Sequence, residues 1–277
     1  MRPAEMVYNK EKGLDEFIDF AREEKGLDLS VYRSTFVNRR LLVRMSYCKA
    51  DAVSDYIHVL KNNPPEWDNF LRSLSINVSE FFRDKDVFNF FYNNCLKEII
   101  RSKESKNHRM INFWSAGCSY GEEPYTLAIM LLESLKERSK FIPRVLATDA
   151  DTQALSVAKE GMFKEGAVKN VSSSLLRRYF TRTSFGKWSV NDSVKRIVLF
   201  KKHNLFDKPL FNYMDAVFCR NVRIYFDKKK AQHVLMHIHS SLRKGGYLVL
   251  GKVETVPVFL EKYFVVIEKC YKIFQKK

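Results

Sequence analysis

The sequence lacks any apolar run approaching the roughly 18 to 20 residues that a membrane-spanning helix requires, and its first residues lack the apolar core of a secretion signal. These absences predict a cytoplasmic protein without membrane insertion. Glycine and proline are sparse, at 10 and 7 of 277 residues, which indicates a globular chain and not a disordered or repetitive one. The chain is long enough to form one large domain or a main domain with a smaller companion, and we expect two domains.

Cysteine is also scarce. The five cysteines are odd in number and none are spaced as C-x-x-C, which argues against a disulfide framework and against a zinc site. His233 and His237 are four residues apart, but no carboxylate or thiolate completes a metal site around them. We therefore expect reduced thiols, histidines on a helix surface and no bound metal.

Positive charge is abundant. Lys and Arg number 48 against 32 Asp and Glu, which gives a formal net charge of +16. Such an excess predicts long-range attraction to an anionic partner. Charge alone leaves nucleic acid, a membrane surface and an acidic protein all open.

The first third of the chain has the apolar spacing of helices. Apolar residues recur at intervals of three and four over residues 14–21, 32–45 and 53–60, which places them on one face of each helix. Pro64 and Pro65 end the third helix, and a fourth starts toward Leu74. We predict an all-α domain over residues 1–90 and, because "RSKESKNHR" is charged and poor in apolar residues, a linker over residues 91–109.

From residue 110 the pattern changes to short apolar runs separated by helices, which is typical of a doubly wound, mostly parallel sheet in the α/β class. The expected strands are residues 111–116, 144–149, 196–200, 215–220 and 247–251. The runs "FVVIEK" and "CYKIFQ" have no helix-length connection and are expected to pair antiparallel at the sheet edge. Turn residues between short β-prone runs predict a small inserted β-hairpin at about residues 181–200.

The first strand of this sheet leads into "SAGCSYGEEPY", where Gly117 and Gly121 occupy a strand-to-helix turn. Glycines at such a turn let backbone approach a ligand closely, although an ordinary tight turn has the same pattern. A phosphate-binding loop would use the following helix N-terminus to hold an anion, yet Glu122 and Glu123 occupy its first turn. Carboxylates there suit a cationic ligand, such as a sulfonium that carries an α-amino group.

The ends of the second and fourth strands carry further polar residues. Asp149 ends the second strand, where an acidic side chain usually binds ribose hydroxyls, and Asp151 is expected to cap the next helix. The fourth strand ends in Arg220, Asn221 and Tyr225 and lacks the Asn-Pro-Pro-aromatic cluster of methylases that act on base amines. These groups are better matched to an anionic acceptor.

Five ordered blocks resemble the chemotaxis receptor methyltransferase family, CheR, over nearly the whole chain: "NVSEFFRD", "WSAGCSYGEEPYTLAI", "ATDADTQALSVAKEGMF", "FCRNVRIYFD" and "GYLVLGKVET". The resemblance implies a Rossmann-like class I fold dependent on S-adenosylmethionine, with a seven-stranded sheet over residues 110–277. It implies a protein-glutamate O-methyltransferase that acts on chemoreceptors in sensory adaptation and releases S-adenosylhomocysteine.

The resemblance also implies roles for individual residues. Arg83 and Tyr225 are expected beside the transferring methyl group. The expected cofactor-binding residues are Asn77, Ser79, Arg83, Gly117, Glu123, Asp149, Asn204, Leu205, Arg220 and Asn221. The chain departs from the family pattern where Ser79 replaces a threonine and where Arg223 and Lys252 add positive charge near the expected mouth of the site.

The expected partner is the acidic helical cytoplasmic region of a chemoreceptor, methylated by a monomeric enzyme. A basic helix carrying Arg33, Arg39, Arg40 and Arg44 is the candidate docking surface, and a solvated basic face is the alternative. A nucleic-acid methyltransferase would also explain the charge, but no nucleic-acid-binding module is recognisable and we expect no nucleic-acid partner. A non-catalytic module that binds the cofactor as a signal is a further alternative, but such a module would not need Arg83 and Tyr225.

Overall fold

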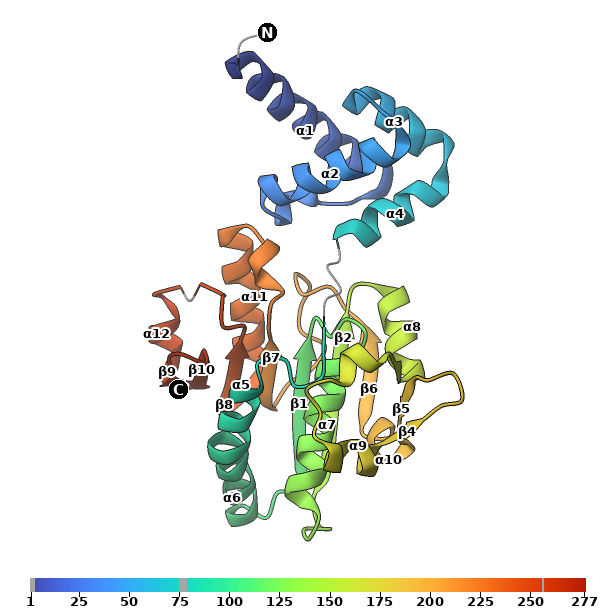
Figure 1. Cartoon of the computed structure of the whole chain (residues 1–277). Helices are drawn as coiled ribbons and strands as arrows, with labels where there is room; N and C mark the ends of the chain where they lie inside the picture. The colour runs from blue at the N-terminus through green and yellow to red at the C-terminus, as the bar shows by residue number, and fades with distance from the viewer. Residues whose placement is uncertain (1–2, 75–78, 256) are drawn as a thin grey trace. The chain divides into compact units, whose positions relative to one another are not determined.

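The structure is a computed structural model that describes residues 3–74, 79–255 and 257–277 (Figure 1). The chain divides into two compact units. The first comprises Met1–Ile76 with Tyr225–Ala231, and the second comprises Asn77–Ile224 with Gln232–Lys277. Each described helix is too short or too polar to cross a bilayer.

The first unit is all-α, as predicted. Its helices are α1 (Pro3–Lys25), α2 (Ser34–Cys48), α3 (Val53–Asn62) and α4 (Pro64–Leu74), with a 3₁₀ turn η1 (Leu29–Val31). The prolines at 64 and 65 lie at the start of α4, where a missing N–H costs nothing, so α3 ends where the sequence predicted. Phe17, Tyr56 and Phe70 are fully buried at the centre, with Phe17 packed edge-on to Phe70.

Residues 225–231 join this helical unit although they lie far along the chain. Phe226 forms an isolated antiparallel bridge with Tyr32. The Arg33 N–H donates to the Tyr225 carbonyl at 3.0 Å, and the Asp227 N–H donates to the Val31 carbonyl at 2.9 Å. The Tyr225 ring packs 4.9 Å from the Phe36 ring. The backbone after the fourth predicted strand is therefore anchored in the helical unit.

The second unit is built on a seven-stranded sheet of order β6-β2-β1-β7-β8-β10-β9. Its strands are β1 (Met110–Ala116), β2 (Ile142–Asp149), β6 (Val198–Lys202), β7 (Met214–Cys219), β8 (Leu242–Leu250), β9 (Phe264–Glu268) and β10 (Ile273–Lys276). The first five are parallel, and β10 pairs antiparallel with β8 and β9. The predicted fold class and the antiparallel edge pair are confirmed.

Helices connect and cover these strands: α7 (Glu122–Leu135), α8 (Thr152–Glu160), α11 (Lys228–Ser241) and the short α12 (Leu260–Tyr263). A smaller antiparallel sheet of order β3-β5-β4 is inserted between β2 and β6. It contains β3 (Met162–Phe163), β4 (Phe180–Arg182) and β5 (Trp188–Val190), together with η3 (Glu165–Val168), α9 (Ser173–Tyr179) and α10 (Asp192–Lys195). The predicted hairpin is thus β4 and β5, while β3 was not predicted.

The linker predicted at residues 91–109 was wrong for most of its length. Helix α5 (Lys85–Phe90), a π-helical turn η2 (Phe91–Leu96) and α6 (Lys97–Ser105) follow one another without a break. Phe91, Cys95 and Ile99 are fully or almost fully buried, and the Phe91 ring packs against Phe113 of β1 and Phe218 of β7. The stretch therefore belongs to the sheet unit, whose boundary lies at residue 77 and not at residue 90.

Candidate functional site

The predicted site residues of the sheet unit gather at the carboxyl edge of the parallel strands. Ala116 at the end of β1 is in register with Thr148 of β2, and Asp149 of β2 is in register with Lys202 of β6. On the other side, Cys219 of β7 pairs with Leu250 of β8. The residues that follow these strand ends therefore line one edge of the sheet, which is where ligands bind in open α/β folds.

The turn after β1 needs glycine for a reason that the sequence did not reveal. Gly117 has a φ of +82°, and a Cβ there would lie 2.5 Å from Cγ2 of Val222 in the loop after β7. The Gly117 N–H and the Cys118 N–H both donate to the Thr148 carbonyl, at 2.8 and 2.9 Å. Gly117 thus allows two strand-end loops to pack together.

Asp149 is held in place by the backbone on both sides of the edge. Its Oδ2 accepts from the Ser119 N–H at 2.8 Å, and its Oδ1 accepts from the Asp151 N–H at 3.0 Å. Burial nevertheless raises the pKa of Asp149 above its ordinary value. Backbone hydrogen bonds from Asp151, Ser119 and Ala150 oppose this rise, and the acceptor capacity that remains suits a ribose hydroxyl. Asp151 caps α8 through Gln153 and Ala154, as the sequence predicted.

Two carboxylates lie in the first turn of α7. Glu123 Oε1 accepts from the Ser115 hydroxyl at 2.7 Å, and Oε2 lies 3.5 Å from Nη1 of Arg220. Burial raises the pKa of Glu123, although Arg220 opposes the rise. The neighbouring Glu122 is buried, and its Oε2 has no hydrogen-bond partner among the described residues. Burial raises the pKa of Glu122 as well, although the Ser79 hydroxyl bonds to it.

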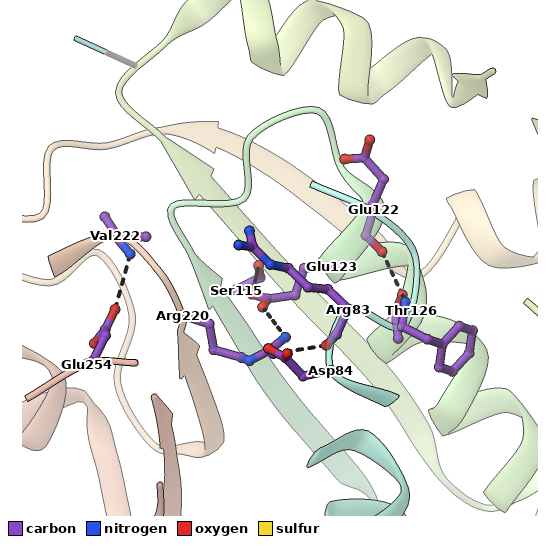
Figure 2. Close-up of polar contacts among 10 residues, drawn as sticks. Arg83, Asp84, Ser115, Glu122, Glu123, Thr126, Arg220, Val222 and Glu254 are labelled. Atoms are coloured by element: carbon purple, nitrogen blue, oxygen red, sulfur yellow. Dashed lines mark hydrogen bonds and ion pairs between the residues drawn. The ribbon is translucent and has the colours of Figure 1, made fainter. Parts of the chain in front are cut away.

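Arg220 anchors the segment that carries Arg83 (Figure 2). Its side chain is 2% exposed, and Nη2 donates to the Arg83 carbonyl at 2.9 Å and to Asp84 Oδ2 at 2.6 Å. The guanidinium also lies 4.9 Å from the centre of the Phe88 ring. Arg220 was predicted as a cofactor ligand. Most of its N–H groups instead form hydrogen bonds with protein acceptors. Nε is buried without a partner among the described residues.

The Arg83 segment is fixed from other sides too. The Phe81 N–H donates to the Ala167 carbonyl at 3.0 Å, and the Phe82 N–H donates to the Thr126 hydroxyl at 3.1 Å. Phe82 has a φ of 53°, which bulky residues adopt only when surrounding contacts require it. The Arg83 side chain extends from this segment toward Ser115 and Glu123 in Figure 2, and its charge partly opposes the rise in the pKa of Glu123 that burial causes.

The remaining predicted cofactor residues lie along the same edge or outside the described part. The His203 N–H donates to the Asp149 carbonyl at 3.0 Å, which brings the adjacent Asn204 and buried Leu205 to the end of β2. Asn221 has a φ of 60° and lies against Gly251, where a Cβ would come within 2.8 Å of the Asn221 N atom. Asn77 lies outside the described residues.

The structure adds Glu254, which sequence reasoning did not single out. Arg223 was expected to add charge at the mouth of the site, but it is 5% exposed and its Nη1 contacts Glu254 Oε2 at 2.8 Å. Glu254 Oε1 accepts from the Val222 N–H at 3.2 Å, so this carboxylate fixes the loop after β7. Lys252, also expected to add charge, makes an ion pair with Asp86. The only available signal was the glutamate in "GKVET".

The four arginines of the predicted docking surface differ in their surroundings within the helical unit. Arg44 makes two hydrogen bonds, of 2.8 and 2.6 Å, with the buried Glu66, so its position does not favour docking. Arg33 Nε donates to the Phe226 carbonyl at 3.2 Å. Arg40 stacks over Phe36 at 5.2 Å, and burial lowers its pKa. Arg39 is exposed.

Taken together, the sheet edge gathers more buried carboxylate than nearby cations neutralise. Glu122, Glu123 and Asp149 all have raised pKa values because burial disfavours their charged forms. A ligand with a positive charge and several hydroxyl or amino donors would relieve this. These carboxylate acceptors therefore fit an aminoacyl sulfonium nucleoside, which supplies the positive charge and the donors. No group of three or more metal-ligating side chains occurs in the described part of the chain.

Comparison with known families agrees with this arrangement. The description "CheR methyltransferase, all-alpha domain" matches residues 12–75, and "CheR methyltransferase, SAM binding domain" matches residues 77–273. This chain belongs to the CheR methyltransferase family. The two CheR matches meet at the boundary between the two structural units. The matched second domain is the one that binds S-adenosylmethionine in the family, and it contains the whole carboxyl edge.

Curated CheR relatives match along most of their own lengths. The chain is 32% identical to "Chemotaxis protein methyltransferase" of Borreliella burgdorferi over 248 residues, 88% of each chain. It is 31% identical to "Chemotaxis protein methyltransferase 2" of Pseudomonas aeruginosa, covering 83% of this chain and 81% of that one. It is also 31% identical to the Vibrio parahaemolyticus "Chemotaxis protein methyltransferase", covering 91% and 93%.

Proposed function

We propose that this CheR-family chain is a protein-glutamate O-methyltransferase that methylates chemoreceptor glutamates with S-adenosylmethionine for sensory adaptation and releases S-adenosylhomocysteine. The observation that carries the proposal is the carboxylate-rich sheet edge beside the anchored Arg83 segment, within a domain matched as SAM binding. Relatives called chemotaxis protein methyltransferases support the receptor as substrate. The cytoplasmic location and the monomeric state stay predictions.

The cofactor's parts can be assigned to residues of the sheet edge. Bound S-adenosylmethionine supplies a methyl group on positively charged sulfur. The acceptor capacity that Asp149 keeps beside its backbone hydrogen bonds receives a ribose hydroxyl, and Glu123 faces the cationic part of the ligand. Asn204 and Asn221 add polar groups at the neighbouring strand ends. Ser79 reaches the site through its contact with Glu122.

The acceptor needs no general base. A glutamate with a pKa of about 4.3 is ionised near neutral pH, so its carboxylate oxygen is already nucleophilic. The enzyme must therefore align this oxygen with the methyl group and exclude water. Anion and cation both disappear in the step, so a group that gripped the carboxylate too firmly would slow the reaction. We assign Arg83 and Tyr225 to orienting the acceptor.

An acidic helical region of a receptor is the proposed macromolecular partner. Arg33 and Arg39 are exposed and Arg40 is partly exposed, so these three side chains are the best placed of the predicted set. Arg44 forms an ion pair with Glu66, so we leave it out of the proposed docking surface. Docking of this kind weakens as salt screens the charges, whereas a basic face that serves only solubility gives no receptor complex.

The chemistry is tested by incubating the protein with methyl-labelled S-adenosylmethionine and either a receptor cytoplasmic fragment or bulk nucleic acid. We expect label on the receptor that mild alkali releases as methanol, because esters hydrolyse where N-methyl groups do not. Alkali-stable label on nucleic acid would instead favour a nucleic-acid methyltransferase. Tight S-adenosylhomocysteine binding with no transfer to either acceptor would identify a signalling module.

The assigned residues are tested by Arg83→Ala and Tyr225→Phe. We expect kcat to fall on the order of 100-fold for Arg83→Ala, because the acceptor loses its alignment, and less for Tyr225→Phe. Arg177→Ala, which removes an exposed arginine of α9, serves as the matched control. S-adenosylhomocysteine affinity is measured in parallel to separate cofactor binding from turnover. Turnover near that of the control in both variants would remove their assigned role.

A further inference from the structure

A cavity of about 540 Å³ lies at the amino edge of the sheet, opposite the carboxylate-rich edge. Its walls come from the end of α6, the turn before β7, the end of α11, the start of β8 and the end of β10. Its size is that of a typical small-molecule site. Because β1 spans seven residues, the two edges are separated by about 20 Å. A ligand here would leave the carboxyl edge free.

Five basic side chains line the cavity: Lys103, Lys106, Arg243, Lys244 and Lys276. The carboxylate of the fully buried Asp215 contacts two of them, with Lys103 Nζ at 2.9 Å from Oδ1 and Arg243 Nε on the same oxygen. Its Oδ2 accepts from the Asn112 N–H at 2.9 Å. The single negative charge of Asp215 therefore cannot neutralise both Lys103 and Arg243, and the other lysines add further positive charge.

The other three lysines of the cavity have no carboxylate within ion-pair distance in the part of the chain that the structure describes. Lys106 and Lys244 are exposed. Lys276 Nζ donates to the His239 and Leu242 carbonyls, both at 2.7 Å, so it satisfies acceptors at the end of α11 without being neutralised. Burial lowers the pKa of Lys276, which is consistent with a partly dehydrated cation in the cavity wall.

An aromatic ring stands beside these cations. Tyr213 lines the cavity, is 79% exposed and has a φ of 58°. A left-handed backbone is uncommon for a bulky residue and costs free energy, so the turn before β7 holds this ring outward at some expense in stability. An accessible aromatic face next to lysines is the pairing that binds a base together with its phosphates.

We propose that this cavity binds a nucleoside phosphate, with Lys106, Lys244 and Arg243 around the phosphates and the Tyr213 ring against the base. Phosphate oxygens would receive the charge-assisted hydrogen bonds that Asp215 leaves unused. The cationic lining disfavours the positively charged methyl donor, so the two edges of the sheet select ligands of opposite charge. This inference does not depend on methyl transfer.

The test is calorimetric titration of the full chain with guanosine triphosphate, inorganic pyrophosphate and guanosine. Each titration is run both without and with saturating S-adenosylhomocysteine, which blocks the carboxyl edge. We expect one guanosine triphosphate per chain, weaker binding of pyrophosphate and the weakest binding of guanosine. Binding that disappears in the presence of S-adenosylhomocysteine would assign the nucleotide to the other edge and overturn the proposal.

Charge reversal provides the sharper test. The double variant Lys106→Glu with Lys244→Glu should raise the Kd for guanosine triphosphate at least tenfold. The control reverses Lys159 and Lys187, exposed lysines of the same unit that do not line the cavity, and should change Kd less than about twofold. An equal effect of both pairs would show that only overall charge matters. Unchanged melting temperatures verify that each variant folds.

Tyr213→Ala separates the base contact from the phosphate contact. We expect the Kd for guanosine triphosphate to rise about tenfold and the Kd for pyrophosphate to stay unchanged, because only the nucleotide has a base to stack. Equal binding of both ligands in the parent and the variant would overturn the base contact. Absence of binding by both ligands, or binding of an oligonucleotide alone, would overturn the site.

Discussion

The two edges of the central sheet differ in the sign of their charge, although the same strands form both. Glu122, Glu123 and Asp149 gather at the carboxyl edge with raised pKa values, while lysines and Arg243 surround the single buried carboxylate of Asp215 at the amino edge. The net charge of +16 belongs to the whole chain and does not predict the charge of either edge. Overall charge thus says little about the ligand that a local site selects.

Removing the carboxylate of the amino edge gives the largest expected effect. Asp215→Asn leaves Lys103 and Arg243 facing each other without a counter-charge in a buried position. We expect the free energy of unfolding to fall by about 3 to 5 kcal/mol, measured by urea denaturation. Asp192→Asn, an exposed control in α10, should change it by less than about 0.5 kcal/mol. A loss at Asp215 as small as the control's would mean that this edge tolerates its positive charge.

At the carboxyl edge, an equivalent change should affect binding more than stability. Asp149→Asn removes the charge that receives the ribose hydroxyls, and we expect S-adenosylhomocysteine affinity to fall about 10- to 100-fold by calorimetry. Asp151→Asn in the same turn is the matched control, because asparagine caps a helix as well as aspartate does. Equal affinity in the two variants would argue against Asp149 as the ribose ligand.

The smallest expected effect is at Glu122, where the substitution should stabilise the protein and not weaken stability or binding. Its buried Oε2 has no hydrogen-bond partner among the described residues, so Glu122→Gln should raise the free energy of unfolding by about 1 kcal/mol at pH 8. The pKa of Glu122 is raised in the folded state, so the parent protein loses stability as pH rises from the ordinary glutamate pKa through the raised one.

The advantage of Glu122→Gln should therefore disappear as pH falls and the parent glutamate becomes protonated. Urea denaturation at pH 5 and pH 8 measures the difference, with the exposed Glu160→Gln as control. A variant that is less stable than the parent at pH 8 would show that the ionised Glu122 is better solvated than its burial indicates. The charge difference between the two edges would then be smaller than we infer.

Much of the fold and of the carboxyl edge could be predicted from sequence because the signals are local. Short apolar runs predicted the strands. Asp149 is the last residue of β2 and Gly117 follows β1, and a parallel sheet must bring these two strand ends together. The helical stretch at residues 91–105 was missed although Phe91, Cys95 and Ile99 are spaced four apart, because the charged run after them resembled a linker. The helical spacing was the better signal.

Contacts between distant residues could not be predicted in this way. Arg220 binds the Arg83 carbonyl 137 residues away, and Arg223 is neutralised by Glu254. A single sequence shows that charged residues exist but not which of them meet, so both arginines were assigned to ligands or to an open mouth. The amino-edge cavity was missed for the same reason, since its cations come from separate parts of the chain.

The return of residues 225–231 to the helical unit has a consequence for cutting the chain. The backbone bonds from Arg33 and Asp227, and the bridge between Tyr32 and Phe226, lie within one unit but join segments on either side of residue 77. Two polypeptides divided at that residue would thus still share a folded body, and co-expression should yield a non-covalent heterodimer. The sheet half produced alone would leave Phe226 without its bridge to Tyr32.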